Sequence, residues 1–138
     1  MHSPELQRTD MDKLRTFTDS RGNLTIVEEG VEVPFKIQRV YWIHGVPEGE
    51  ERGKHSNRVS SEYVIAISGS VEITLEDVNG RRTYHLDSND KGLLIPPDTW
   101  DELRNFSPDA VLLVMASHSY DESTYINSYE KFLESIGK

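Results

Sequence analysis

A chain of 138 residues is long enough to bury a hydrophobic core and indicates a single domain. Acidic side chains outnumber basic ones by 24 to 15, and the formal net charge of −9 disfavours nonspecific binding to nucleic acid or to an anionic membrane. The chain has no cysteine, which excludes disulfides and thiolate metal sites.

The first residues differ in character from the rest of the chain. Residues 1–12 are polar, contain Pro4 and show no sustained hydrophobic period, so we expect a tail there and a folded domain over residues 13–138. The beginning lacks a basic and then apolar signal pattern, and the longest apolar runs, near Ile65 and Val111, are too short to span a bilayer. We therefore expect a cytoplasmic protein.

The body of the chain consists of short apolar segments separated by turn residues. Asn79-Gly80 is the strongest hairpin signal among them. Many short strands without a long helical period predict an all-β sandwich or barrel. The expected strands lie at residues 15–17, 23–27, 36–43, 63–67, 71–75, 83–86, 92–97, 100–103 and 110–116.

The C-terminal residues carry a different pattern. The stretch from Asp121 to Thr124 can cap a helix. An apolar stripe at helical spacing follows it, formed by Tyr125, Ile126, Tyr129, Phe132 and Leu133. We expect a short helix here that lies against the sandwich.

Alternation along two of the expected strands points to one polar pocket. In the strand over residues 36–43, Arg39 and Tyr41 share a face with Ile43. His55 and Asn57 also lie two residues apart, so both would point to one face of an extended strand, and Glu62 would come from the strand that follows. An imidazole, an amide and a carboxylate could therefore converge inside the β-structure.

The spacing of His55, Asn57, Glu62 and Gly69 resembles the first cupin motif, which usually has two histidines, a glutamate and a closing glycine. The second cupin motif would fall at residues 96–101, with Asp101 where cupins often have a metal-binding histidine. Taken literally, this would give a metal set of one imidazole and three oxygen donors. Amide ligands bind transition metals poorly, so a metal-dependent cupin is the weakest hypothesis.

A narrower resemblance covers nearly the whole chain from about residue 13. The matching stretches are Arg21-Gly22-Asn23-Leu24, residues 33–41, Arg52-Gly53 with His55, residues 92–102 and residues 116–126. Together they resemble the sugar 3,4-ketoisomerases, cupins that act on dTDP-4-keto-6-deoxyglucose on the way to the dideoxyamino sugars of bacterial surface glycans. The resemblance implies a small single-domain jelly roll that needs no metal or other cofactor. It also implies a homodimer, often with exchanged N-terminal strands.

Three polar positions depart from the pattern of these isomerases. Asn57 replaces the second histidine of a His-x-His pair, and Glu62 replaces a usual glutamine. Asp101 stands where histidine is frequent. Either the substrate or the chemistry has therefore changed.

The isomerisation of a 4-keto sugar requires three chemical roles from the residues of the pocket. Moving a ketone from carbon 4 to carbon 3 of a hexose requires a base with a pKa near neutrality, a donor for the enediolate and a proton returned to carbon 4. The resemblance assigns the acid/base role to His55, and Tyr41 could donate to the enediolate. Glu62 could take over the lost base role if burial raised its pKa.

The remaining candidates are expected to bind the substrate. Arg39 or Arg52 could hold the diphosphate, and Asn57 could hydrogen-bond a sugar oxygen. Trp100 could stack on a base or sugar at the rim of the pocket, beside Asp101 and Glu102 from the same motif. Arg52 could equally brace a turn, and Trp100 could equally be a packing residue.

A second hypothesis belongs to another class of protein. Removing one of two acid/base groups often costs a factor of about 10² or more in rate. Asn57 therefore also fits a noncatalytic cupin that binds a nucleotide sugar or a related saccharide.

Overall fold

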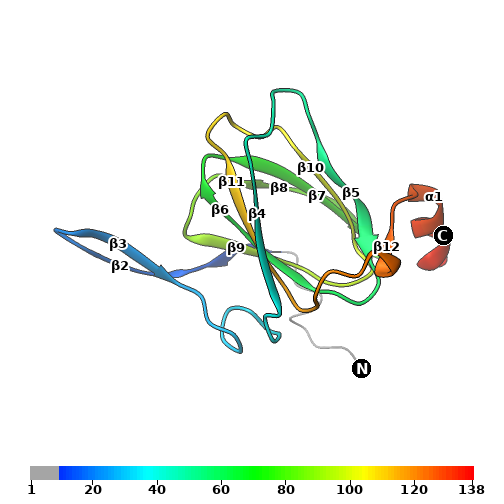
Figure 1. The fold of residues 1–138 in the computed structure, drawn as a ribbon, viewed down its shortest axis with the longest axis horizontal. Helices are drawn as coiled ribbons and strands as arrows, with labels where there is room; N and C mark the ends of the chain where they lie inside the picture. Colours follow the sequence, from blue (N-terminus) through cyan, green and yellow to red (C-terminus); the bar gives the residue numbers. More distant parts are fainter. Residues whose placement is uncertain (1–9) are drawn as a thin grey trace.

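The computed structural model describes residues 10–138, which form two antiparallel five-stranded sheets that face each other (Figure 1). This confirms the all-β sandwich predicted from the sequence. The first sheet has the order β1 (Asp12–Lys13), β9 (Lys91–Ile95), β6 (Glu62–Ser68), β11 (Val111–Ala116) and β4 (Arg39–His44). The second has the order β12 (Tyr125–Ile126), β5 (Arg52–Asn57), β10 (Trp100–Arg104), β7 (Val71–Asp77) and β8 (Gly80–Leu86).

Apolar side chains from both sheets fill the space between them. Alternation along each strand sends one set of side chains into this core. A second cluster covers the outer face of the first sheet, where Val33 and the partly buried Phe35 pack over Tyr63, Ile65 and Leu94. Because both faces of β6 are covered, the run from Tyr63 to Ala66 is buried without alternation.

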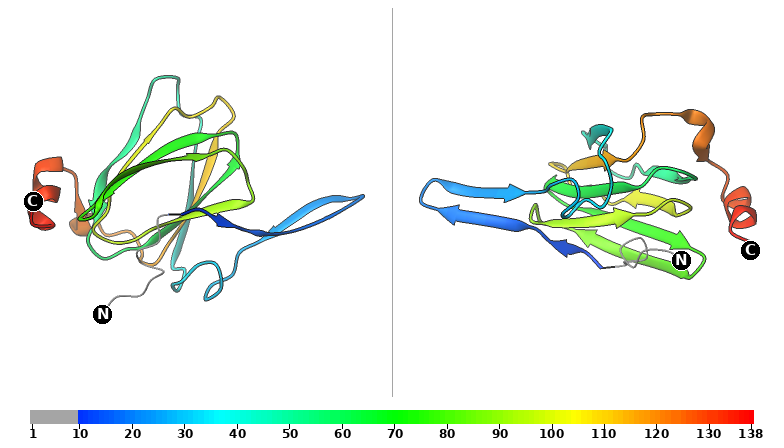
Figure 2. Two further views of the ribbon diagram at one scale, coloured as in Figure 1. Left: turned by 180° about the vertical axis from the view of Figure 1, so that it is seen from behind. Right: turned by 90° about the horizontal axis from the view of Figure 1, so that it is seen from below.

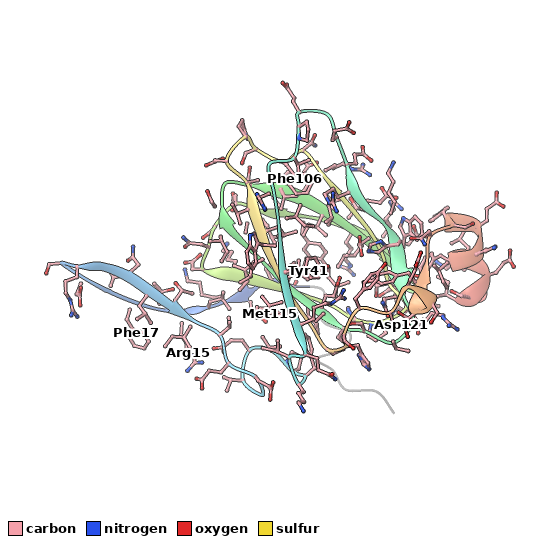
Figure 3. The ribbon with its side chains drawn as sticks, viewed as in Figure 1. Arg15, Phe17, Tyr41, Phe106, Met115 and Asp121 are labelled. Atoms are coloured by element: carbon pink, nitrogen blue, oxygen red, sulfur yellow. The ribbon has the colours of Figure 1, made fainter. Side chains whose placement is uncertain are left out.

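Strand β4 shows the alternation that the sequence predicts. Arg39, Tyr41 and Ile43 point between the sheets, as expected, and Figure 3 shows Tyr41 there. Val40 and Trp42 point outward and are 50% and 59% exposed. Because β4 is the last strand of its sheet, its outer edge has no β-partner within residues 10–138.

The hairpin of β2 (Arg15–Asp19) and β3 (Gly22–Ile26) projects away from the two sheets (Figures 1 and 2). Its two strands pair with each other and, within the described residues, with no other strand. Two large apolar side chains on it, Phe17 and Leu24, are 62% and 58% exposed. The hairpin therefore buries little of its apolar surface in a single chain.

The boundary expected after residue 12 is wrong by at least one residue. Asp12 pairs with Gly92 as part of β1 and accepts a hydrogen bond of 2.7 Å from the hydroxyl of Tyr63. Tyr63 is fully buried, so its hydroxyl needs an internal partner, and the carboxylate of Asp12 supplies one. Residues 1–9 of the predicted tail lie outside the described residues.

The C-terminal helix is shorter than predicted. Asp121 caps only a 3₁₀ turn, η2 (Glu122–Thr124), and Tyr125 and Ile126 then pair with β5 as strand β12. The helix α1 spans Tyr129–Ser135, and the hydroxyl of Ser128 accepts a hydrogen bond from the backbone of Lys131 at its start. Backbone pairing with β5 therefore takes the residues that the apolar stripe assigned to the helix.

Helix α1 is fixed to the second sheet by the side chains of Phe132 and Tyr129, and the Tyr129 hydroxyl donates a hydrogen bond of 2.8 Å to Glu76 on β7. Phe132 is fully buried, and its ring lies 5.7 Å from the ring of Trp100 on β10. Within residues 10–138 no helix is long and apolar enough to cross a membrane. The cytoplasmic location expected from the sequence stays a prediction.

Substituting Phe132→Ala should lower the free energy of unfolding by about 3–5 kcal/mol, because it leaves a cavity between α1 and the sheet. Urea unfolding monitored by circular dichroism measures this. Val78→Ala is the control, since Val78 is 59% exposed, and it should change stability by less than about 0.5 kcal/mol. Equal, small effects of the two substitutions would contradict the docking of α1.

Candidate active site

One cavity of about 440 Å³ opens between the two sheets. Strands of both sheets form its walls, and residues that follow β11 contribute to its lining. Its polar and aromatic lining consists of Arg39, Tyr41, Arg52, His55, Glu62, Asp101, Tyr120, Glu122, Tyr125 and Asn127. Six of the predicted site residues are therefore brought together: Arg39, Tyr41, Arg52, His55, Glu62 and Asp101.

A bulge in β5 determines which of its side chains face the cavity. Asp101 lies opposite His55 and Glu102 lies opposite Gly53, so Lys54 is the extra residue. Gly53 and Lys54 have φ angles of 78° and 62°. Arg52 and His55 would point to opposite faces of a regular strand, but across this bulge both line the cavity.

Glycine is required at position 53 for a second reason. A Cβ atom there would lie 2.2 Å from Oδ1 of Asp101, closer than any real contact. The missing side chain leaves room for the Asp101 carboxyl beside the backbone of β5. The bulge therefore positions His55 and Asp101 together.

His55 and Asp101 form a pair on the wall made by the second sheet. Nε2 of His55 lies 3.6 Å from Oδ2 of Asp101. The ring of His55 also meets the ring of Tyr125 edge-on, with 4.9 Å between centroids. Burial and the positive charge of Arg52 lower the pKa of the His55 imidazole below its ordinary value, so the ring is neutral at pH 7.

Tyr41 and Glu62 form a second pair on the wall made by the first sheet. The hydroxyl of Tyr41 donates a hydrogen bond of 2.8 Å to Oε2 of Glu62. Glu62 is only 8% exposed, and burial raises the pKa of its carboxyl. Burial and the Glu62 carboxylate also raise the pKa of the Tyr41 phenol, which therefore stays protonated.

Arg39 lies beside this second pair. Its guanidinium stacks over the Tyr41 ring at 5.1 Å from the centroid and lies 5.7 Å from the centroid of Tyr120. It also donates a hydrogen bond of 3.2 Å to the hydroxyl of Tyr125. Its buried Nε has no hydrogen-bond partner among the described residues.

The surroundings of the Asp101 carboxyl stabilise a negative charge less than those of Glu62 do. It is 5% exposed, and no donor within residues 10–138 forms a hydrogen bond with its carboxyl. Burial and the neighbouring Glu62 carboxylate raise the pKa of Asp101 well above its ordinary value. The cavity thus holds an imidazole with a lowered pKa next to a carboxyl group with a raised pKa.

Asn57 does not line the cavity, so its expected contact with the substrate is wrong for this structure. Its Oδ1 accepts hydrogen bonds of 2.9 and 2.7 Å from the backbone of Val59 and Ser60, and its Nδ2 donates one of 2.9 Å to Oγ1 of Thr124. β5 ends at Asn57, and the turn that follows needs an acceptor there.

The metal set suggested by the cupin motif therefore loses its amide ligand. Within the described part of the chain, no three His, Asp or Glu side chains are grouped to hold a metal ion. His55 and Asp101 remain together without Asn57.

Trp100 and Glu102 also point away from the cavity, contrary to expectation. Because Asp101 faces inward, its two neighbours on β10 face outward. Trp100 packs under α1 and donates a hydrogen bond of 2.9 Å to Glu102. Glu102 also accepts from Arg81 and Arg104, so its carboxylate is used in the outer face of the sheet.

The C-terminal segment contributes residues that the sequence analysis missed. Tyr120, Glu122, Tyr125 and Asn127 all line the cavity. Three of them fall in the stretch over residues 116–126 that carries part of the resemblance, but the pattern from Asp121 onward predicts a helix cap followed by a helix. Pairing of Tyr125 with Asn57 brings the segment to the cavity instead.

The fold and the site define a cupin-type jelly roll with titratable side chains in the cavity between its sheets. Residues 7–137 match the family described as FdtA: WxcM-like, C-terminal. The chain is 39% identical over 120 residues to the TDP-4-oxo-6-deoxy-alpha-D-glucose-3,4-oxoisomerase of Aneurinibacillus thermoaerophilus, which covers 87% of this chain and 86% of that protein. The chain therefore belongs to the FdtA family.

Solved structures show the same relationship. A 3,4-ketoisomerase from Helicobacter canadensis superposes with a TM-score of 0.89 at 35% identity, covering 94% of this chain and 97% of that one. QdtA, a sugar 3,4-ketoisomerase from Thermoanaerobacterium thermosaccharolyticum solved in complex with TDP, superposes with a TM-score of 0.88 at 35% identity. That match covers 92% of this chain and 93% of QdtA.

The imidazole of His55 should titrate below the ordinary histidine pKa of about 6.5. Replacing Arg52→Gln should raise this pKa, because a nearby positive charge no longer opposes protonation of the ring. NMR titration of the ring protons, assigned with His55→Asn, measures it. Arg58→Gln, outside the cavity, should leave the titration unchanged, and a His55 pKa above 6.5 in the unsubstituted protein would contradict the described environment.

Proposed function

We propose that this protein is an isomerase that moves the keto group of a TDP-linked 4-keto-6-deoxyhexose from carbon 4 to carbon 3. The observation that carries the proposal is the neutral imidazole of His55 in a cavity that also contains two arginines and two buried carboxyl groups. The relatives named as 3,4-ketoisomerases, and the TDP bound to one of them, support the substrate class.

His55 is the base in this proposal. Its neutral Nε2 takes the proton from carbon 3, and electrons move onto the carbon 4 oxygen to give an enediolate. A base must be unprotonated to act, and the lowered pKa of His55 ensures this at neutral pH. Desolvation of the cavity strengthens the interactions that stabilise the enediolate.

The two arginines and the Tyr41–Glu62 pair bind and orient the substrate. Arg52 is exposed and both Arg52 and Arg39 line the cavity, so together they can hold the diphosphate. Glu62 accepts a hydrogen bond from the hydroxyl of Tyr41, and this bond keeps the phenol oriented beside Arg39. The reaction moves only protons within one sugar, so the proposal uses no redox cofactor.

Incubation of the protein with TDP-4-keto-6-deoxyglucose in deuterated buffer should replace the carbon 3 hydrogen by deuterium and yield the 3-ketone. His55→Asn should slow both processes by a factor of about 10²–10⁴, because the base is lost. Proton NMR of the sugar follows the exchange, and His85→Asn, with His85 exposed on β8, is the matched control.

Deuterium exchange combined with a measurement of TDP binding separates the isomerase from the noncatalytic hypothesis. TDP should raise the melting temperature of the unsubstituted protein under either hypothesis. A shift with TDP, but without exchange or product between pH 6 and 9, would contradict the isomerase and favour a binding protein.

We also propose that the protein is a homodimer in which the hairpin β2–β3 of each chain packs on the other. Large apolar side chains stay exposed to solvent in a single chain at two places. They are Phe17 and Leu24 on the hairpin and Val40 and Trp42 on β4. The edge of β4 offers unpaired backbone groups that a second chain can use. A partner that covers both features would bury them together.

Multi-angle light scattering after gel filtration should give the mass of two chains for the unsubstituted protein. The pair of substitutions Phe17→Glu and Leu24→Glu should give one chain, because charges in an apolar contact oppose association. Val78→Glu is the control, since Val78 is exposed in the turn between β7 and β8. A mass of one chain for the unsubstituted protein would contradict the dimer.

A further inference from the structure

The proposed isomerisation needs a second proton carrier beside His55, a role for which the sequence suggested Glu62. After His55 removes a proton from carbon 3, another proton must reach carbon 4. Asn57, which occupies the position of the expected second histidine, is bound to Thr124 and to the turn after β5. The carrier must therefore be another residue that lines the cavity.

Two of the carboxyl groups that line the cavity, Glu62 and Asp101, are buried and are the candidates, and their contacts differ. Glu62 accepts the Tyr41 hydroxyl and lies near the positive charge of Arg39, and both contacts favour its ionised form. Asp101 receives neither contact and faces the negative charge of Glu62. A proton shared by the two groups therefore belongs on Asp101.

Asp101 also has the better position for proton transfer with His55. The two residues are direct cross-strand partners of β5 and β10, and 3.6 Å separates Nε2 from Oδ2. Glu62 comes from the opposite sheet and is hydrogen-bonded to Tyr41. Geometry and charge thus select the same carboxyl group.

We propose that Asp101 is the second catalytic proton carrier and that its carboxylic acid protonates carbon 4 of the enediolate. This inference rests on the isomerase function proposed above. Asp101 then performs the task that an imidazole at position 57 was expected to perform.

The protons balance over one turnover. His55 gains the proton of carbon 3, the proton of the carbon 3 hydroxyl moves to the carbon 4 oxygen, and Asp101 gives its proton to carbon 4. The site is left with an imidazolium and a carboxylate 3.6 Å apart. Transfer of one proton from His55 to Asp101 restores both groups, and burial of the pair favours this neutral state.

The arrangement also determines the configuration of the product. His55 and Asp101 lie on the same wall of the cavity, so the proton leaves carbon 3 and arrives at carbon 4 on the same face of the sugar ring. The 4-keto precursor has no hydrogen on carbon 4, and in the gluco configuration the hydrogens of carbons 3 and 4 lie on opposite faces of the ring. Same-face transfer therefore gives the 3-ketone with the galacto configuration at carbon 4.

The test compares hydrogen exchange at carbon 3 with formation of the 3-ketone in Asp101→Asn. We expect exchange within about tenfold of the unsubstituted rate, because His55 is intact, and product formation lowered by about 10² or more. Asp87→Asn, an exposed isosteric change, is the control and should alter neither rate. A merely structural role of Asp101 would lower both rates together.

The outcomes separate the two proposals. Product formation by Asp101→Asn within fivefold of normal, or an equal loss of exchange and turnover with TDP binding intact, would overturn the role of Asp101. The carbon 4 configuration, determined by NMR with the unsubstituted protein, tests it without a variant: galacto supports the proposal and gluco overturns it. Absence of exchange in the unsubstituted protein would instead overturn the isomerase function.

Discussion

The bulge at Gly53 and Lys54 is the constraint on which the site depends. It changes the alternation of β5 so that Arg52 and His55 face the same cavity, and it sets His55 opposite Asp101 on β10. Without the extra residue, one of these side chains would point out of the sandwich. Glycine at position 53 then allows the Asp101 carboxyl to lie against the bulged backbone.

Asn57, Glu62 and Asp101, which depart from the usual isomerase pattern, all lie at or beside the cavity between the sheets. Asn57 lies at the end of β5 and ties the C-terminal segment to it through Thr124, so an amide there supports the cavity from outside. Glu62 adds a negative charge on one wall, and burial and that charge raise the pKa of the Asp101 carboxyl on the other wall. The loss of an imidazole at one position is thus matched by a protonated carboxyl group at another.

Much of the fold and part of the site could be predicted from the sequence. Alternation along β4 placed Arg39 and Tyr41 in the pocket, because strand period is a local property. The same rule shows that Trp100, Asp101 and Glu102 cannot all face one side, and applying it would have excluded two of them. The bulge at Lys54 and the pairing of Tyr125 with β5 depend on contacts between distant segments, which no local pattern reveals.

A crystal structure with the TDP-linked 4-keto sugar bound tests the central claim most directly. If His55 and Asp101 transfer the protons, the sugar lies between the sheets, with carbon 3 within about 3.5 Å of Nε2 of His55. We also expect carbon 4 to lie toward Asp101, on the face of the ring that His55 contacts. A sugar bound outside this cavity, or one with carbons 3 and 4 directed to the Tyr41 wall, would contradict it.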